Sequence, residues 1–284
     1  MRFARTIMTN TTLAPDQPTT LPEYSVTINV AATRQVAISS PDHLHPHGTR
    51  RDNSRNPRFN EKLYALFPRM DRSLTLLDLG CSGGGFVRDC LNDGCLAVGL
   101  EGSDYSQKRH RAEWAVIPEY LFVCDVTAPF EITMRTGSDG PNQRHEFDVI
   151  TSWELIEHIA EQDLEAVAGN VRRHLKPGGL WIMSVSPHPD DSVEAVLHQT
   201  VKPKAWWIGT FSKLGFYHLE AFVQYFNTQF VRGPKFGAPE SFHLVLSPDP
   251  ALAPKIPSET WRRRLFDVWN GSRPQGFLRR LILG

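Results

Sequence analysis

A short apolar run that ends in a cluster of glycines constrains the fold of this chain more than any other feature. Residues Leu74–Leu79 are apolar apart from Thr75 and Asp78, and the run stops at Gly80-Cys81-Ser82-Gly83-Gly84-Gly85. The next segment, Phe86–Leu91, opens a helix. A buried strand that turns through glycines into a helix predicts the first unit of a parallel β-α-β sheet, with backbone amides free to approach a ligand.

Strands and helices alternate over most of the chain. Apolar runs predict parallel strands at 74–79, 96–100, 120–124, 147–152 and 180–185, and two final antiparallel strands at 220–226 and 242–246. Helices are expected at 58–70, 86–91, 105–114, 164–175 and 204–214, with a polar loop at 127–144. This order predicts a doubly wound α/β fold, a mostly parallel seven-stranded sheet with an antiparallel last strand and helices on both faces.

Charge divides the chain into three parts. Lys+Arg and Asp+Glu balance at 31 each, but residues 1–60 and 255–284 are basic, so the middle is acidic. Such a distribution does not indicate a polyanionic partner for the central domain. We expect a flexible or loosely attached extension over 1–56, a domain over 57–248 and a basic amphipathic extension over 249–284.

The cysteines and the hydropathy pattern indicate a cytoplasmic protein. Cys81, Cys90, Cys95 and Cys124 have no zinc-like pairing, so buried free thiols in a reducing compartment are expected. No apolar run approaches the roughly 18–20 residues that span a bilayer. The N-terminus also lacks the apolar core of a signal peptide.

The glycine turn resembles the first motif of the class I, Rossmann-like, S-adenosylmethionine-dependent methyltransferases. Gly80 and Gly84 stand where that motif has glycines, and Ser82 replaces its middle glycine. The resemblance covers roughly residues 58–247 and implies S-adenosyl-L-methionine as cofactor. It also implies that Asp78 helps to hold the methionyl part of that molecule.

Further matches follow in order along the chain. Glu101 ends the second expected strand about 20 residues after Asp78, where an acid can accept hydrogen bonds from ribose hydroxyls. In the family, the acid at Asp125 binds the adenine amino group, and the Val126 amide meets the ring. The turn Lys176-Pro177-Gly178-Gly179 also matches, and it counts against a nicotinamide dehydrogenase, the main alternative. The implied cofactor-binding residues are Asp78, Gly80, Cys81, Ser82, Gly84, Glu101, Gly102, Asp125, Val126 and Trp153.

Catalytic candidates should lie just beyond the fourth expected strand, because methyl transfer needs an aligned acceptor and, for a hydroxyl, a base. On a helix, Glu154, Glu157 and His158 would share one face. We take Glu154, His158 and His198 as catalytic candidates and assign no metal. The pattern is similar to that of small-RNA 2′-O-methyltransferases, in which two glutamates and two histidines hold a metal. A Glu-His pair here is also common in metal-free methyltransferases, so acid/base, metal-binding and structural roles all stay open.

Two other segments carry weaker signals. Trp206 and Trp207 follow the fifth strand, where such enzymes place acceptor-binding elements; they either stack on the acceptor or dock in the core. The cluster His43-Leu44-His45-Pro46-His47 lacks a carboxylate or thiolate to complete a metal site, so a solvated loop is favoured.

These observations predict a cytoplasmic methyltransferase that acts on an oxygen of a small molecule or a glycan precursor. The alternatives are a metal-assisted RNA 2′-O-methyltransferase, with RNA a less favoured acceptor, and a non-catalytic cofactor-binding regulatory protein. Near the C-terminus, Trp261, Leu265, Val268 and Trp269 form a helical stripe beside Arg262-Arg263-Arg264. A helix packed on the domain is favoured there, and a peripheral membrane or partner contact is the alternative.

Overall fold

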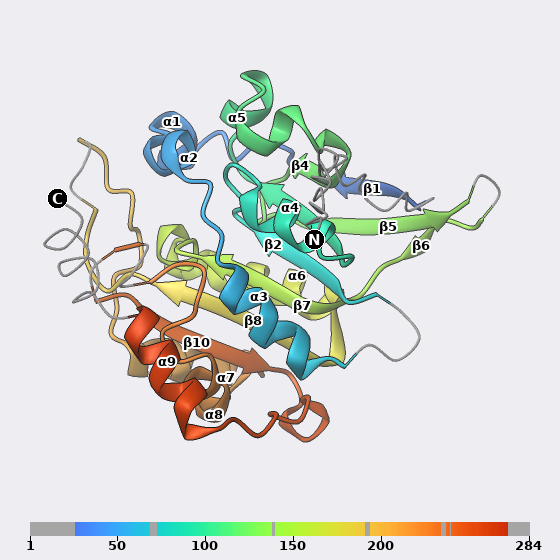
Figure 1. Ribbon diagram of the computed structural model, residues 1–284. Coiled ribbons are helices and arrows are strands. Elements are labelled where there is room, and N and C mark those ends of the chain that lie inside the picture. Colours follow the sequence, from blue (N-terminus) through green and yellow to red (C-terminus); the bar gives the residue numbers. More distant parts are fainter. Residues whose placement is uncertain are drawn as a thin grey trace, which may run out of the picture.

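The computed structural model describes residues 26–68, 73–137, 140–190, 194–233, 237–238 and 240–271. Its main element is a seven-stranded sheet with helices packed around it (Figure 1). The strands of this sheet are β2 (Thr75–Leu79), β3 (Leu96–Glu101), β4 (Leu121–Val123), β7 (Phe147–Trp153), β8 (Leu175–Val185), β9 (Tyr217–His218) and β10 (Phe242–Ser247).

The strand order is β4-β3-β2-β7-β8-β10-β9. The first five strands of this order run parallel, and β10 is antiparallel to both of its neighbours. Every residue of β2, β3 and β7 is buried, so both faces of the sheet are covered. The predicted fold class is confirmed. The direction of winding reverses between β2 and β7, which is where doubly wound sheets bind ligands beyond their carboxyl ends.

Nine helices and several short 3-10 turns connect these strands within the described residues. Their bounds are α1 (Pro41–Leu44), α2 (His47–Arg51), α3 (Pro57–Leu66), α4 (Gly85–Asn92), α5 (Tyr105–Lys108), α6 (Leu164–His174), α7 (Lys204–Lys213), α8 (Glu220–Phe226) and α9 (Trp261–Gly271). None of the helices in the part of the chain that the structure describes has the length and apolar character needed to cross a bilayer.

A second, antiparallel sheet corrects two expectations. It consists of β1 (Val26–Ala32), β5 (Phe130–Thr136) and β6 (Gln143–Arg144), in that order. The polar loop expected at 127–144 is therefore wrong, because Phe130, Ile132 and Met134 alternate inward at strand spacing between polar residues. Residues 26–32 are also not loosely attached, since β1 pairs with β5 along its whole length.

Two further segments differ in secondary structure from the prediction. Residues 220–226 form helix α8 instead of a strand, because Phe222, Tyr225 and Phe226 recur at helical spacing and are all buried. The helix expected over 105–114 ends at Lys108, and a 3-10 turn follows at Ala112–Ala115. Tyr217–His218 supplies the edge strand that had been assigned to 220–226.

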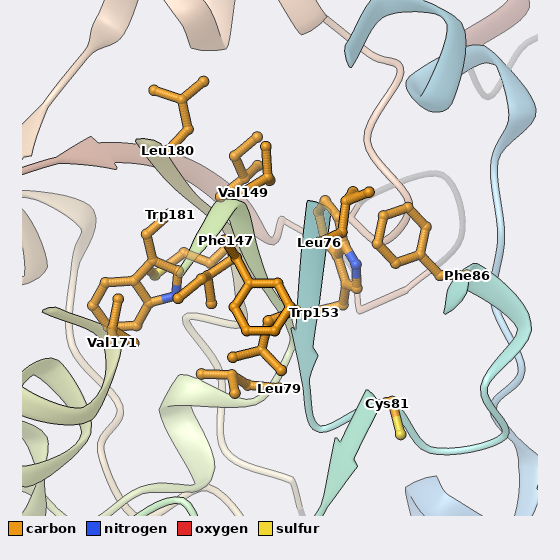
Figure 2. Close-up of a cluster of buried hydrophobic side chains, with 14 of the residues drawn as sticks. Leu76, Leu79, Cys81, Phe86, Phe147, Val149, Trp153, Val171, Leu180 and Trp181 are labelled. Atoms are coloured by element: carbon orange, nitrogen blue, oxygen red, sulfur yellow. The ribbon is translucent and has the colours of Figure 1, made fainter. Parts of the chain in front are cut away.

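The core beside the glycine turn is aromatic. Figure 2 shows Trp153, at the end of β7, close to Phe86 of α4. The two ring centroids are 5.9 Å apart, and Phe59 of α3 packs edge-on against Trp153 at 5.1 Å. Edge-to-face contacts of this kind fix ring orientation as well as burying apolar area. Trp153 thereby ties the first helix after the glycines to α3.

Candidate functional site

A cavity of about 800 Å³ lies at the carboxyl ends of the parallel strands. Its walls come from the segments that follow β2, β3, β4, β7 and β8, together with residues of the N-terminal segment and the loop near Arg232. Among the predicted site residues, the cavity is lined by Gly80, Ser82, Glu101, Gly102, Asp125, Val126, Trp153, Glu154, His158 and His198. Asp78, Cys81 and Gly84 do not line it.

The glycine turn brings the backbone close to this cavity. Gly80 and Gly84 have φ angles of 72° and 84°, in the left-handed region that favours glycine. A Cβ atom on Gly84 would lie 2.7 Å from Leu121 Cδ1, which is too close for ordinary packing. Ser82 also has a positive φ, of 48°, and its hydroxyl donates to the backbone oxygen of Asp52 at 3.0 Å.

Two acids of the glycine-turn region are buried in different ways. Glu101 accepts hydrogen bonds from the backbone amides of Ser82, at 2.8 Å, and Ser103, at 3.2 Å, at the cavity wall. Burial raises the pKa of Glu101 above its ordinary value. Asp78 lies beneath the wall, where it accepts a 2.6 Å hydrogen bond from Thr151, and burial raises its pKa to about 8. Only Glu101 meets the cavity directly.

Asp125 closes the same end of the cavity. One carboxylate oxygen accepts hydrogen bonds from the Thr127 amide, at 2.9 Å, and the Thr127 hydroxyl, at 2.6 Å. The other oxygen lies 3.3 Å from Nε of Arg34, a residue of the N-terminal segment. Val126 follows Asp125 along the wall.

Glu154 does not share a face with Glu157 and His158, so that expectation is wrong. Its φ of 48° interrupts the chain after β7, and only Ile156–His158 form a 3-10 turn. The Glu154 carboxylate accepts hydrogen bonds from Arg232 Nε at 2.9 Å, the Ala238 amide at 2.7 Å and the Ser241 hydroxyl at 2.8 Å. Four donors therefore occupy this carboxylate, since the Arg232 Nη2 atom also contacts it.

Glu157, His158 and His198 lie together at the other end of the cavity. One candidate ligand atom from each residue lies within 4.8 Å of the other two. Glu157 is fully buried, and its Oε1 accepts a 2.7 Å hydrogen bond from the Ser186 amide. Its Oε2 has no hydrogen-bond partner among the described residues, and burial raises the pKa of this carboxyl to about 7.

The pKa values of the two histidines shift in opposite directions. Burial disfavours the charged form of His158, but Asp42, whose carboxylate lies 2.8 Å from Nδ1, outweighs it and raises the pKa to about 9. The rings of His158 and His198 are 4.6 Å apart at 82°. Burial, and then the charge of His158, lower the pKa of His198, whose Nδ1 contacts the backbone oxygen of His188.

Residues 33–56, here called the N-terminal cap, cover this cavity. The Ala37 amide donates to the Gly102 oxygen at 2.9 Å, and Asp52 pairs with Arg232 at 2.9 Å. With the Arg34–Asp125 and Asp42–His158 contacts, the cap is bound to both ends of the cavity. Our sequence reasoning missed these residues. The available signal was a polar residue followed by proline at Ser40-Pro41 and Asn56-Pro57, which begin α1 and α3.

The remaining sequence candidates fall outside the centre of the site. Trp207 is fully buried and stacks on Phe211, so it docks in the core, and neither it nor Trp206 lines the cavity. His43 and His47 line the cavity but do not belong to the group of candidate metal ligands.

Comparison with known proteins identifies a family for more than half of this chain. The model of the methyltransferase domain family matches residues 51–229. The ubiquinone biosynthesis O-methyltransferase of Mesorhizobium japonicum is 29% identical over 114 residues, which cover 39% of this chain and 40% of that protein. The match therefore spans less than half the length of this relative.

Two solved structures have a similar arrangement of elements. The 1,6-didemethyltoxoflavin-N1-methyltransferase of Burkholderia thailandensis matches with a TM-score of 0.44 and 16% identity, over 72% of this chain and 82% of that one. A TehB-like methyltransferase of Corynebacterium glutamicum matches with a TM-score of 0.43 and 17% identity, over 67% of this chain and 86% of that one.

Proposed function

The chain belongs to the class I S-adenosylmethionine-dependent methyltransferases, and from this premise we propose that it methylates an oxygen atom of a small-molecule or glycan acceptor. One observation carries the proposal: His198 lines the same cavity as Glu101 and Asp125. Its Nδ1 faces a backbone oxygen, which leaves Nε2 as the ring atom able to accept a proton.

The acids at the ends of β3 and β4 would bind the cofactor at one end of the cavity. Glu101 has two carboxylate oxygens that can accept hydrogen bonds from the two ribose hydroxyls. Asp125 would accept from the adenine amino group, beside the Val126 amide. Asp78 would act from beneath the wall, through Thr151 or the turn, because it does not line the cavity. When bound, S-adenosylmethionine supplies the methyl group as an electrophile on sulfur.

The acceptor end would be formed by His198, Glu157 and His158. A neutral imidazole with a lowered pKa can remove the proton of an acceptor hydroxyl as the oxygen is methylated. The unpaired Oε2 of Glu157 can accept a second hydrogen bond from the acceptor. Glu154 is a positioning residue in this scheme, because Arg232, Ala238 and Ser241 already occupy its carboxylate. The name of the Mesorhizobium relative, an O-methyltransferase, supports oxygen as the atom methylated.

The test is methyl transfer from labelled S-adenosylmethionine to phenols, sugar hydroxyls and amines, with the wild type and His198→Ala. We expect O-methylated product, and a loss of kcat of about 100-fold or more in the variant. Wild-type activity should fall on the acid side, below the lowered pKa of His198, and this fall should be absent in the variant. Cofactor binding should be unchanged in the variant. Methylation of nitrogen, or wild-type kcat in His198→Ala, would contradict the proposal.

A second candidate is metal-assisted 2′-O-methylation of RNA, because Glu157, His158 and His198 form a group of candidate metal ligands. Carboxylate and imidazole ligands suit a divalent transition metal, and the unpaired Glu157 Oε2 fits such a role. When bound, the metal would orient the ribose hydroxyls. Glu154 does not join this set, since its carboxylate is committed to Arg232 and Ser241.

Chelation separates the two candidates. Full activity in excess chelator, together with no increase in the unfolding temperature on adding Mn²⁺ or Zn²⁺, would eliminate the metal-assisted function. Loss of activity in chelator, restored by the metal and accompanied by activity on RNA, would favour it over the proposal above. The unfolding temperature is the readout that does not depend on finding the acceptor.

A further inference from the structure

Helix α9 is attached to the domain through its acidic residue, Asp267. The side chain of Asp267 is buried and lies 2.8 Å from the Lys62 ammonium and 2.8 Å from the Arg58 guanidinium, both on α3. Its backbone oxygen accepts hydrogen bonds from Thr228 and Gln229, just beyond α8. Figure 1 shows α9 beside α8, at one side of the main sheet. One face of the helix is therefore fixed against the domain.

The acid that precedes the helix is also turned inward. Glu259 has a side chain that is 6% exposed, and it lies 2.6 Å from the Lys62 ammonium. Residues 255–284 contain seven Lys and Arg residues but only these two acids, Glu259 and Asp267. Since Lys62 and Arg58 neutralise both acids from below, the charged side chains that the described residues 255–267 leave exposed are cationic.

Large apolar side chains stand beside these charges. Trp261, Leu265 and Phe266 are 67%, 59% and 56% exposed, and Arg262 and Arg264 are exposed between them. Arg263 differs, because its guanidinium pairs with Glu61 of α3. Three exposed apolar side chains within six residues are more than the scattered single ones that need no explanation.

We propose that the exposed face of α9 docks on the surface of an anionic phospholipid bilayer. Tryptophan and arginine suit the headgroup region, and the leucine and phenylalanine reach the acyl boundary. The sequence that continues from the helix, 272–284, adds Arg273, Arg279 and Arg280, five large apolar residues and no acid. A nucleic acid would match the arginines but not the apolar side chains. The proposal is independent of the acceptor proposed above.

The experiment is co-sedimentation of the full chain with phosphatidylcholine vesicles, with and without phosphatidylglycerol. We expect binding only to the anionic vesicles and weaker binding at high salt. Arg262→Gln with Arg264→Gln should weaken binding about 25-fold, or roughly fivefold for each arginine. Trp261→Ser with Leu265→Ser should weaken it about tenfold or more.

Matched controls remove the same chemistry elsewhere on the surface. Lys108→Gln with Lys213→Gln removes two exposed charges, and Val116→Ser with Leu252→Ser removes two exposed apolar side chains. Both control pairs should bind anionic vesicles as the wild type does, and thermal unfolding should show that all four variants fold. Equal binding to both kinds of vesicle, equal losses in the α9 and control pairs, or tighter binding to a single-stranded RNA than to vesicles would overturn the proposal.

Discussion

The two ends of the cavity are built in different ways. At the proposed cofactor end, Gly80, Glu101 and Asp125 each lie within two residues of the end of a strand, so the sheet itself places them. At the proposed acceptor end, His158 meets Asp42 and His198, which are 116 and 40 residues away along the chain. The residues of the first end are thus placed by local turns on the sheet, although Arg34 of the cap also pairs with Asp125, whereas the contacts among the residues of the second end themselves join distant segments. We expect substitutions to affect the two ends independently.

The largest expected effect is on cofactor affinity. Glu101→Ala removes two acceptors at the wall, and we expect S-adenosylmethionine to bind more weakly by at least about 100-fold, since hydrogen bonds to charged groups contribute about 1.5–3 kcal/mol each. His198→Ala, at the other end, should change that affinity by less than about threefold, because distant sites act independently. Calorimetric titration measures both. Equal losses in the two variants would show that the ends are coupled.

The second prediction concerns the rigidity of the cofactor end. Gly84→Ala places a Cβ 2.7 Å from Leu121 at a φ of 84°, so we expect a loss of about 2–4 kcal/mol in the free energy of unfolding. Gly209→Ala is the matched control, since a Cβ there meets nothing within 4 Å in helix α7. That change should stabilise the protein by about 0.5–1 kcal/mol. Urea unfolding that gives the two variants the same stability would contradict this account.

The third prediction tests the contacts that hold the cap to the acceptor end. Arg232→Gln leaves the carboxylates of Asp52 and Glu154 without their cation, and we expect the protein to lose about 2–3 kcal/mol of unfolding free energy. Amide hydrogen exchange should increase in residues 33–56 more than in β2 or β3. An increase spread evenly over the sheet and the cap would mean that the cap is not a separate unit.

The last prediction concerns the pH dependence of the cap. The pKa of His158 is about 9 in the folded protein, above the 6.5 of the unfolded chain. A raised pKa contributes stability that is complete below pH 6.5 and is lost as the pH rises through 9. We expect a loss of about 3 kcal/mol between these limits, and a much smaller loss in Asp42→Asn. Unfolding measured at pH 6.5 and 9.5 checks both values, and equal pH dependence in the two proteins would contradict the assignment to this pair.

Sequence reasoning recovered the parts of the molecule that depend on local patterns. The strands around Asp78, Glu101 and Trp153 were predicted because buried parallel strands are continuous apolar runs with abrupt ends. The seven-stranded fold follows from their order. These features need no knowledge of which distant segments meet.

The rest of the site depends on tertiary contacts that leave a weak local signal. Glu154 was expected on a helix with Glu157, but its contact with Arg232, 78 residues later, accompanies a positive φ that no spacing rule indicates. Asp42 lies in a polar segment whose composition suggested a loose extension, although it contacts His158. Two wrong predictions, the loop at 127–144 and the strand at 220–226, were avoidable. The alternation at Phe130–Thr136 and the helical spacing in Glu220–Phe226 were both visible in the sequence.

Ser82 has a consequence for how such sites diverge. The left-handed backbone at this position costs a non-glycine residue about 1–2 kcal/mol, and a glycine would avoid that cost. The serine hydroxyl offsets part of that cost through its hydrogen bond to Asp52, which contributes about 1 kcal/mol. Exchange between serine and glycine, one base apart in some codons, is therefore nearly neutral for folding, yet it adds or removes a link to the cap. Selection can thus adjust how firmly the cavity is covered without endangering the sheet beneath it.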